Sequence, residues 1–223
     1  MPSKQTVAEV FHDASAAPAV RGFLHSPAAS NGDVLILTHG AGSNCNAPLL
    51  IALANAFAKH NYTVLRCDLP FRQERRTGPP FPGNAERDRA GLHNAVAAMR
   101  KIATGRIFLG GHSYGGRQST MLAAAEPDLV NGLLLTSYPL HPPGKPAQLR
   151  VQHFASLKVP ALFVQGTRDA FGSIEEIEKA LQSVPARTQL LKVEGAGHDL
   201  GFSGKKQAAE LPDRVLATFA AMF

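Results

Sequence analysis

The sequence predicts an α/β protein in which helices cover both faces of a mostly parallel central sheet. Two features of the 223-residue chain lead to this fold class. Short, continuously apolar runs alternate along the chain with longer stretches whose apolar residues recur at helical spacing. Runs that are apolar at every position are typical of strands buried on both faces, and strands separated by helices pair in parallel.

Six buried strands are expected, at 34–38, 63–66, 106–109, 133–136, 161–164 and 189–193. Asn46 is expected to cap a helix that runs to about residue 60, because Pro48 then falls in its first turn. Asn84 is expected to cap a second helix, with Ala90, His93, Val96, Ala97 and Met99 at helical spacing. Further helices are expected at about 115–125, 174–184 and 212–223.

Composition predicts one globular domain over residues 1–223, since 44% of the residues are hydrophobic and 18% are charged. Cys45 and Cys67 are too few for a secreted disulfide framework, so we expect reduced thiols and a cytoplasmic location. The chain has no continuous apolar run near its start and none approaching 18 residues. We therefore expect neither a signal peptide nor a membrane partner.

The formal net charge of +6 does not by itself indicate a nucleic-acid partner. The basic residues are scattered apart from Arg72, Arg75 and Arg76, and no RNA-binding aromatic motif, zinc spacing or basic helix accompanies them. We expect no nucleic acid, no metal and no cofactor. Whether the chain forms a homo-oligomer cannot be predicted from the sequence.

Gly111-His112-Ser113-Tyr114-Gly115 is a G-x-S-x-G motif between a predicted strand and a predicted helix. In that context the motif forms a sharp turn that presents the serine hydroxyl at the edge of the sheet. Glycines two residues to either side of Ser113 are needed because bulkier neighbours would clash. The motif therefore predicts that Ser113 is a nucleophile.

A serine nucleophile needs a base and an orienting acid, which in this arrangement follow in the order Ser, Asp or Glu, His. Three histidines follow Ser113, namely His141, His153 and His198. The first two lie before the best acid candidate, in or just beyond a proline-rich loop. His198 lies in a small-residue loop directly after the last predicted strand, so we expect it to be the base.

Asp169 is the best candidate for the acid, because a short turn separates it from the strand at 161–164. That position places it at the same edge of the sheet as Ser113. Three nearby glutamates, Glu175, Glu176 and Glu178, fall on the next predicted helix and are expected to face solvent. Asp199 adjoins His198, where it cannot easily fold back onto the ring.

Acyl transfer also needs two amides that bind the oxyanion. Tyr114, directly after the nucleophile, is expected to supply one amide, and the loop after an early strand the other. In His39-Gly40-Ala41-Gly42-Ser43 the small residues let the backbone approach the substrate, so we expect Ala41 to be the second donor, with Gly42 as the alternative. A dinucleotide-binding interpretation of these glycines fails because Cys45 occupies the third glycine position.

These residues resemble the α/β-hydrolase superfamily, in which the blocks His39-Gly40, 111–116, 166–169 and Gly197-His198 fall in family order and spacing. The likeness spans roughly residues 20–223. Within the superfamily the chain looks like the small lidless proteins described as dienelactone-hydrolase-like. The likeness is greatest to the branch that includes testis-expressed protein 30, and the shared segments are 39–42, 68–72 and Gly116-Arg117. The resemblance implies a sheet of about eight strands and a Ser-Asp-His triad. Dienelactone hydrolases proper use cysteine where this chain has Ser113, so a lactone substrate is not implied.

No helical lid is expected, because the interval 137–157 is short and contains Pro139, Pro142, Pro143 and Pro146. We expect an open pocket rimmed by this interval and by the loop 70–82. Its lining residues are expected to include Phe71, Arg72, Tyr138, Leu140 and His141. The arginine group Arg72, Arg75 and Arg76 could attract a carboxylate or phosphate on the substrate, and Arg117 is expected to pair with a carboxylate of the protein.

The sequence thus predicts a serine hydrolase that cleaves a small ester or thioester through an acyl-enzyme intermediate. Its expected partner is a small-molecule ester or acyl substrate. A serine peptidase or acyltransferase remains open, because the same three residues serve each. A non-catalytic hydrolase-like binding protein is a further alternative, although it would not need all three residues.

Overall fold

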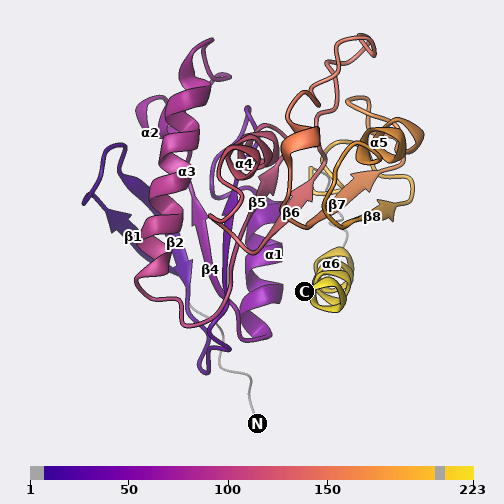
Figure 1. Cartoon of the computed structure of the whole chain (residues 1–223). Helices are drawn as coiled ribbons and strands as arrows, with labels where there is room; N and C mark the ends of the chain where they lie inside the picture. The colour runs from indigo at the N-terminus through magenta and orange to yellow at the C-terminus, as the bar shows by residue number, and fades with distance from the viewer. Residues whose placement is uncertain (1–7, 204–208) are drawn as a thin grey trace.

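The computed structural model, which describes residues 8–203 and 209–223, confirms the α/β class and contains an eight-stranded sheet (Figure 1). The strand order is β1-β2-β4-β3-β5-β6-β7-β8, and in this order each strand from β4 to β8 is parallel to its neighbour in that range. The strands are β1 (Ala8–Asp13), β2 (Val20–His25), β3 (Val34–Thr38), β4 (Thr63–Cys67), β5 (Ile107–His112), β6 (Gly132–Thr136), β7 (Ala161–Gly166) and β8 (Thr188–Val193).

The strands β1 and β2 were not predicted from the sequence pattern. They form an antiparallel pair, and β2 is also antiparallel to β4. The outer strand β1 has no fully buried residue, and Val10 in it is 81% exposed. An edge strand with one neighbour lacks the continuous apolar run that identifies the central strands.

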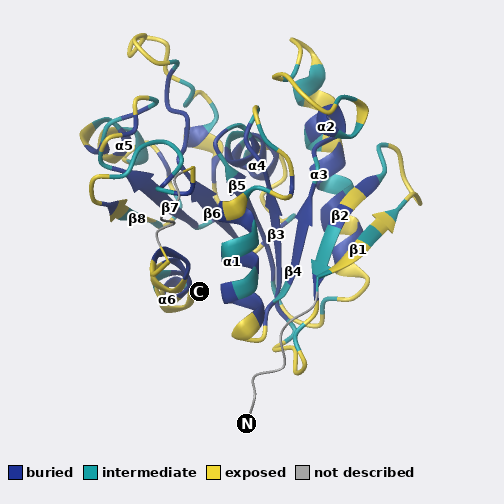
Figure 2. Cartoon of the chain, turned by 180° about the vertical axis from the view of Figure 1, so that it is seen from behind, coloured by how far each residue is buried: buried dark blue, intermediate teal, exposed yellow. Residues whose placement is uncertain are grey.

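Helices cover both faces of the sheet, as predicted (Figure 2). Helices α1 (Pro48–Lys59) and α6 (Leu211–Met222) share one apolar core, while α3 (Asn84–Arg100), α4 (Tyr114–Ala125) and α5 (Ile174–Leu181) contribute to the other. A short helix, α2 (Pro70–Glu74), occupies the start of a segment expected to be a loop. Within the described residues, no helix has both the length and the apolar character needed to cross a bilayer.

Both predicted asparagine caps are wrong. Helix α1 follows Ala47, and the Asn46 side chain instead accepts a hydrogen bond from Arg66 Nη1 at 3.2 Å. Helix α3 begins at Asn84 itself, whose Oδ1 accepts the amide of Phe81 from outside the helix. The buried stripe of α3 is also offset from the predicted face, which included residues that are partly or fully exposed. It consists of Asp88, Gly91, Leu92, Ala95, Val96, Ala98 and Met99.

The carboxyl ends of the parallel strands meet at one edge, where ligand sites form in open α/β sheets. From β3 the chain crosses to β4 on one side, and from β5 it crosses to β6 on the other, so a crevice opens between β3 and β5. Two loops, at 75–83 and 137–153, project beyond this edge (Figure 1). The interval 137–157 contains only a single 3-10 turn, Phe154–Ser156, so no helical lid lies over the crevice.

Candidate active site

Ser113 lies at the tip of a sharp turn between β5 and α4. Its backbone has φ 51° and ψ −116°, a region that is strained for a residue with a side chain. A Cβ at Gly111 would lie 2.7 Å from the carbonyl oxygen of Thr38, and one at Gly115 would lie 2.6 Å from that of His39. The glycines of the motif are therefore required because the turn packs directly against the end of β3.

Three side chains from separate loops form a continuous hydrogen-bonded chain. Ser113 Oγ lies 2.8 Å from His198 Nε2, and His198 Nδ1 lies 2.8 Å from Asp169 Oδ2 and 3.0 Å from Oδ1. Ser113 follows β5, Asp169 follows β7 and His198 follows β8, so parallel pairing brings all three to one edge. This geometry is that of a nucleophile, a base and an orienting carboxylate.

Three groups donate hydrogen bonds to the Asp169 carboxylate. Besides His198, it accepts hydrogen bonds from Gln165 Nε2 and from the amide of Phe171, each at 2.9 Å. The Asp169 side chain is fully buried. Since every approaching group is a donor, this position requires an acceptor-only carboxylate.

Two aromatic rings pack against the imidazole of His198. Phe171 stacks on it with ring centroids 4.1 Å apart, and the centroid of the tilted His112 ring lies 5.2 Å from that of His198. The His198 side chain remains 25% exposed, so solvent reaches it. A base in this position can exchange protons with water while keeping its orientation.

The alternative residues considered from the sequence lie elsewhere. His141 contacts the carboxylate of Glu176 at 3.2 Å, and His153 contacts the hydroxyl of Thr120 at 2.8 Å. The Asp199 carboxylate accepts amides from its own turn, at Gly201 and Ser203. None of these groups bonds to Ser113 or His198.

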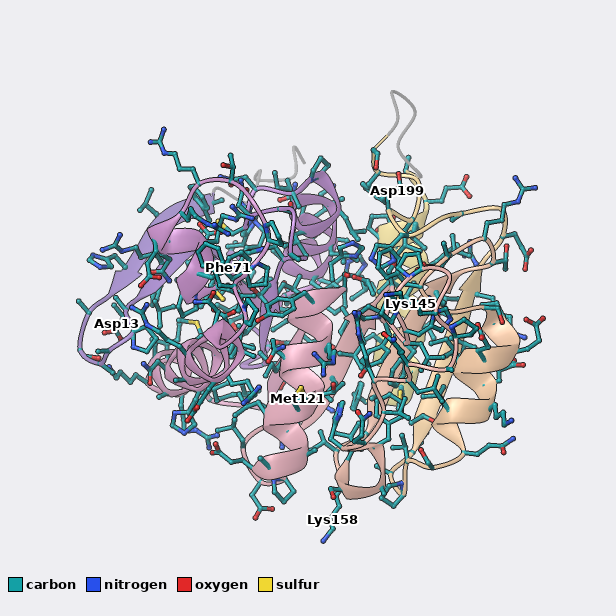
Figure 3. The ribbon with its side chains drawn as sticks, turned by 90° about the horizontal axis from the view of Figure 1, so that it is seen from above. Asp13, Phe71, Met121, Lys145, Lys158 and Asp199 are labelled. Atoms are coloured by element: carbon teal, nitrogen blue, oxygen red, sulfur yellow. The ribbon has the colours of Figure 1, made fainter. Side chains whose placement is uncertain are left out.

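A cavity of about 540 Å³ opens beside Ser113, between the two projecting loops. Figure 3 looks down on this edge, with Phe71 among the purple N-terminal elements and Asp199 beside the yellow C-terminal ones. The cavity is lined by Gly40, Ala41, Gly42, Ser43, Pro79, Pro80, His112, Ser113, Tyr114, Arg117, Pro139, Arg150, Phe171 and His198.

Both residues expected to supply oxyanion amides, Ala41 and Tyr114, line this cavity. Tyr114 is the first residue of α4, where helix amides lack intrahelical acceptors. No backbone acceptor among the described residues takes the Ala41 amide. The Tyr114 ring is fixed from behind, because its hydroxyl donates to Asp88 Oδ2 at 2.7 Å.

The four residues predicted to bind substrate, Phe71, Arg72, Tyr138 and Leu140, are instead buried and do not line the cavity. Phe71 packs against the rings of His39 and Tyr114. Tyr138 and Leu140 belong to the core, where the Tyr138 hydroxyl donates to the carbonyl of Arg150. Their place in proline-rich loops suggested exposure, but their apolar surfaces are packed beneath the loops.

His141, also expected at the pocket, is buried and absent from the lining. The predicted carboxylate partner of Arg117 is not found either, since no ion pair of Arg117 occurs in the described part of the chain. Arg117 and Arg150 line the cavity, and sequence reasoning missed this role for both. The position of Arg117 one helical turn after Ser113 was the available signal.

Arg72 holds the loops around the cavity together. Its guanidinium donates to the carbonyls of Ser43 at 2.7 Å, Ala41 at 2.9 Å, Gly78 at 2.9 Å and Arg75 at 3.0 Å. Two of these carbonyls belong to the loop that carries the Ala41 amide. A single buried cation therefore joins this loop to the 75–83 loop.

Arg72→Lys is expected to lower kcat about tenfold to a hundredfold, because lysine cannot reproduce a planar fork to four carbonyls and the Ala41 loop loses its position. The measurement is steady-state ester hydrolysis with separate kcat and KM. Arg75→Lys is the matched control, since the Arg75 side chain contacts Pro79 and Phe81 and lies outside the cavity lining. Equal losses in both variants would contradict this role of Arg72.

One buried and two half-buried histidines, His25, His112 and His153, make the stability of the fold depend on pH. Burial, followed by the nearby Arg66, lowers the pKa of His25 to about 4; burial, followed by Arg117, lowers the pKa of His153 to about 4. Burial also lowers the pKa of His112 to about 3, with a smaller contribution from His198. These imidazoles therefore stay neutral in the folded protein at neutral pH.

Below about pH 6.5 the unfolded chain binds protons at these histidines that the folded chain does not, so the free energy of unfolding falls as pH drops from 6.5 towards 4. Each histidine contributes at most about 2 kcal/mol of this loss between pH 7 and pH 5. We expect a lower Tm at pH 5 than at pH 7 in thermal denaturation. His153→Gln should shrink that difference, and substitution of the exposed His12 should leave it unchanged. If His153→Gln left the Tm difference between pH 5 and pH 7 unchanged, the lowered pKa of His153 would not be a source of the pH dependence.

Within 8–203 and 209–223, no group of three or more histidine, cysteine, aspartate or glutamate side chains is placed to hold a metal ion.

Comparison with known proteins agrees with this architecture. The sequence model of the family described as "Alpha/beta hydrolase domain" matches residues 31–222, so the chain belongs to the α/β-hydrolase family. A Haemophilus influenzae protein described as "Putative esterase/lipase" is 30% identical over 105 residues, which cover 47% of this chain and 34% of that protein. The chain therefore matches about a third of the length of this relative.

Solved structures share the fold at low sequence identity. Dienelactone hydrolase from Anabaena variabilis superimposes with a TM-score of 0.79 at 18% identity, covering 99% of this chain and 100% of that one. A lidless α/β serine hydrolase from Xanthomonas campestris gives a TM-score of 0.71 at 17% identity, with coverage of 99% and 97%. Est1E from Butyrivibrio proteoclasticus gives 0.75 at 14% identity, with coverage of 96% and 98%.

Proposed function

We propose that the chain is a serine hydrolase that cleaves small esters or thioesters. The observation that carries this proposal is the hydrogen-bonded chain from Ser113 through His198 to Asp169 at a strained turn facing a cavity. Strain, burial of a carboxylate and a base within 2.8 Å of a serine hydroxyl are costly features that the fold alone does not need. The relative described as an esterase/lipase supports the same class of reaction.

In the proposed reaction Ser113 Oγ attacks the substrate carbonyl carbon while its proton passes to His198 Nε2. Asp169 stabilises the imidazolium that forms and fixes its orientation. The amides of Tyr114 and Ala41 donate to the developing oxyanion, a contribution of several kcal/mol to the barrier. His198 then protonates the leaving oxygen or sulfur. In the second half-reaction it takes a proton from the water that attacks the acyl-enzyme carbonyl. The proton then passes to Ser113 Oγ as the bond to the acyl group breaks, which releases the acid and restores the free serine.

Small substrates are favoured by the shape of the site. The cavity of about 540 Å³ is in the lower half of the range of ligand-sized pockets, and no helical lid extends it into a long apolar groove. A serine peptidase or an acyltransferase would use the same three residues, and a non-catalytic binding protein would use none of them. The cytoplasmic location remains a prediction, and it rests on Cys45 and Cys67, which are free thiols as expected of a protein in a reducing compartment.

A series of para-nitrophenyl esters with increasing acyl length tests the proposed substrate size. We expect kcat/KM to be highest for short acyl chains and to fall well before about ten carbons, because the open cavity has no helical lid to cover a longer apolar chain. Release of free acid, rather than transfer of the acyl group to an added alcohol or amine, separates a hydrolase from an acyltransferase. Preference for acyl chains beyond about ten carbons would contradict the proposed site.

A further inference from the structure

Two arginine side chains are the permanently charged groups of the cavity wall. Arg117 and Arg150 line the cavity with Ser113, and no aspartate or glutamate is among the lining residues. Arg117 lies one turn after Ser113 on α4, and its amide bonds to the Ser113 carbonyl at 2.9 Å. Arg150 reaches the cavity from the opposite loop. The reacting hydroxyl therefore shares its cavity with two cations and no protein anion.

Neither guanidinium has an acceptor within the described residues. Arg117 Nε is buried without a hydrogen-bond partner. Every other buried or half-buried arginine of the described chain donates to an oxygen or nitrogen acceptor; these are Arg66, Arg72, Arg75, Arg89 and Arg106. Leaving a buried donor such as Arg117 Nε unsatisfied is costly, and the Arg150 guanidinium beside it lacks an acceptor among the described residues as well, so the two cavity arginines are exceptions that call for a ligand.

The two cations also repel each other. Burial lowers the pKa of the Arg150 guanidinium, and the positive charge of Arg117 lowers it further. A cation in the first turn of α4 moreover opposes the helix dipole. An anion held by both groups would relieve the repulsion and satisfy the free donors together.

The backbone positions of both residues are fixed. Arg150 donates its amide to the carbonyl of Leu140 at 2.8 Å and accepts the Tyr138 hydroxyl at 2.8 Å. Arg117 is held by helix α4. The buried Tyr138 and Leu140 thus support the wall of the cavity from behind, although they do not line it.

We propose that Arg117 and Arg150 bind a carboxylate of the substrate, so that the ester or thioester cleaved at Ser113 carries a carboxylate a few bonds from the scissile carbonyl. Planar guanidinium groups match a carboxylate with paired hydrogen bonds. This inference rests on the proposed hydrolase function. It replaces the anion-binding role expected of Arg72, Arg75 and Arg76, which do not line the cavity.

Matched ester pairs test the substrate class. On the acyl side, para-nitrophenyl hemiglutarate is compared with para-nitrophenyl 5-oxohexanoate, which replaces the carboxylate by an acetyl group. On the leaving-group side, para-acetoxybenzoate is compared with para-acetoxyacetophenone. We expect one pair to show about a tenfold to hundredfold higher kcat/KM for the carboxylate ester. The pair that does so identifies the side on which the anion lies.

This preference should collapse towards unity in Arg117→Gln, Arg150→Gln and the double variant. Arg21→Gln removes the same charge from an exposed position of β2 and should keep the wild-type ratio, which controls for net charge. A wild-type ratio near one for both pairs, or a ratio that survives in the double variant, would overturn the proposal.

Binding without turnover separates this inference from the hydrolase proposal. Glutarate should raise the Tm of the Ser113→Ala protein and should not raise that of the same protein lacking both arginines. If wild type cleaves no ester but glutarate binding depends on the arginines, the hydrolase function fails and the carboxylate site stands. If esters are cleaved without arginine-dependent preference or binding, the site fails alone. Stabilisation by inorganic phosphate but not by glutarate would also overturn the carboxylate assignment.

Discussion

Ser113→Ala is expected to lower kcat for a short para-nitrophenyl ester by a factor of about 10⁴ or more, because it removes the hydroxyl oxygen that lies beside His198 Nε2. Residual turnover would come from the cavity and its amide donors acting on water. The fold should persist, since alanine keeps the Cβ and leaves the backbone at φ 51° no more strained than serine does. The measurements are steady-state kinetics and thermal denaturation of the two proteins.

Ser137→Ala provides a matched control for this substitution. Ser137 is also buried, has φ 50°, and its hydroxyl has no hydrogen-bond partner among the residues that the structure describes. Loss of that hydroxyl should leave kcat near wild type and cost no stability. If Ser113→Ala retained more than about a tenth of wild-type kcat, the nucleophile would have to be another group.

Asp169→Asn is expected to lower kcat about 10³- to 10⁴-fold with little change in the shape of the site. The amide group would turn a donor towards one of three donors, at Gln165, Phe171 or His198. If it faces His198, the imidazole adopts the tautomer that cannot accept the Ser113 proton. The measurement is kcat across pH in wild type and variant.

Asp199→Asn makes the same change at the residue that directly follows His198, and it serves as the matched control. Its carboxylate bonds to amides of Gly201 and Ser203 and not to the imidazole, so we expect a loss below about tenfold. Comparable losses at the two aspartates, or a larger loss at Asp199, would show that Asp169 does not orient the base.

The candidate triad could be predicted from the sequence because each of its features is local. The glycine pattern around Ser113 encodes a turn, and the apolar runs before Asp169 and His198 encode the parallel strands that bring them to one edge. Chain order then removes the other histidines. The close approach of Gly111 and Gly115 to β3 explains why so short a motif is specific.

The wall of the cavity could not be predicted in this way, because burial of a loop residue depends on contacts distant in sequence. Arg72 resembled a free basic residue beside Arg75 and Arg76, yet it donates to the loop at 41–43, about 30 positions earlier. Tyr138 and Leu140 lie among prolines but pack into the core. Arg117 was expected to have a carboxylate partner, and the structure instead places it at the cavity with Arg150.

The same reasoning applies to the fold. A central strand such as β3 can be recognised in the sequence because its residues are buried at every position and nearly all apolar. The edge strand β1 has exposed and half-buried positions, so its sequence carries no such run. The asparagine caps at the starts of α1 and α3 were reasonable from propensity, but other donors bind both side-chain oxygens, a distant one at Asn46 and one three residues earlier at Asn84. Arg66 binds the Asn46 oxygen, and the amide of Phe81 binds that of Asn84.

The central claim is that Ser113 is an activated nucleophile, and covalent labelling tests it most directly. The folded wild-type protein is treated with a fluorophosphonate, and the modified residue is located by intact-mass and peptide-mass spectrometry. The account predicts one adduct per chain, on Ser113, with labelling abolished in Ser113→Ala, strongly slowed in Asp169→Asn and unaffected in Ser137→Ala. Absence of an adduct on folded wild type, or an adduct on a different residue, would contradict it.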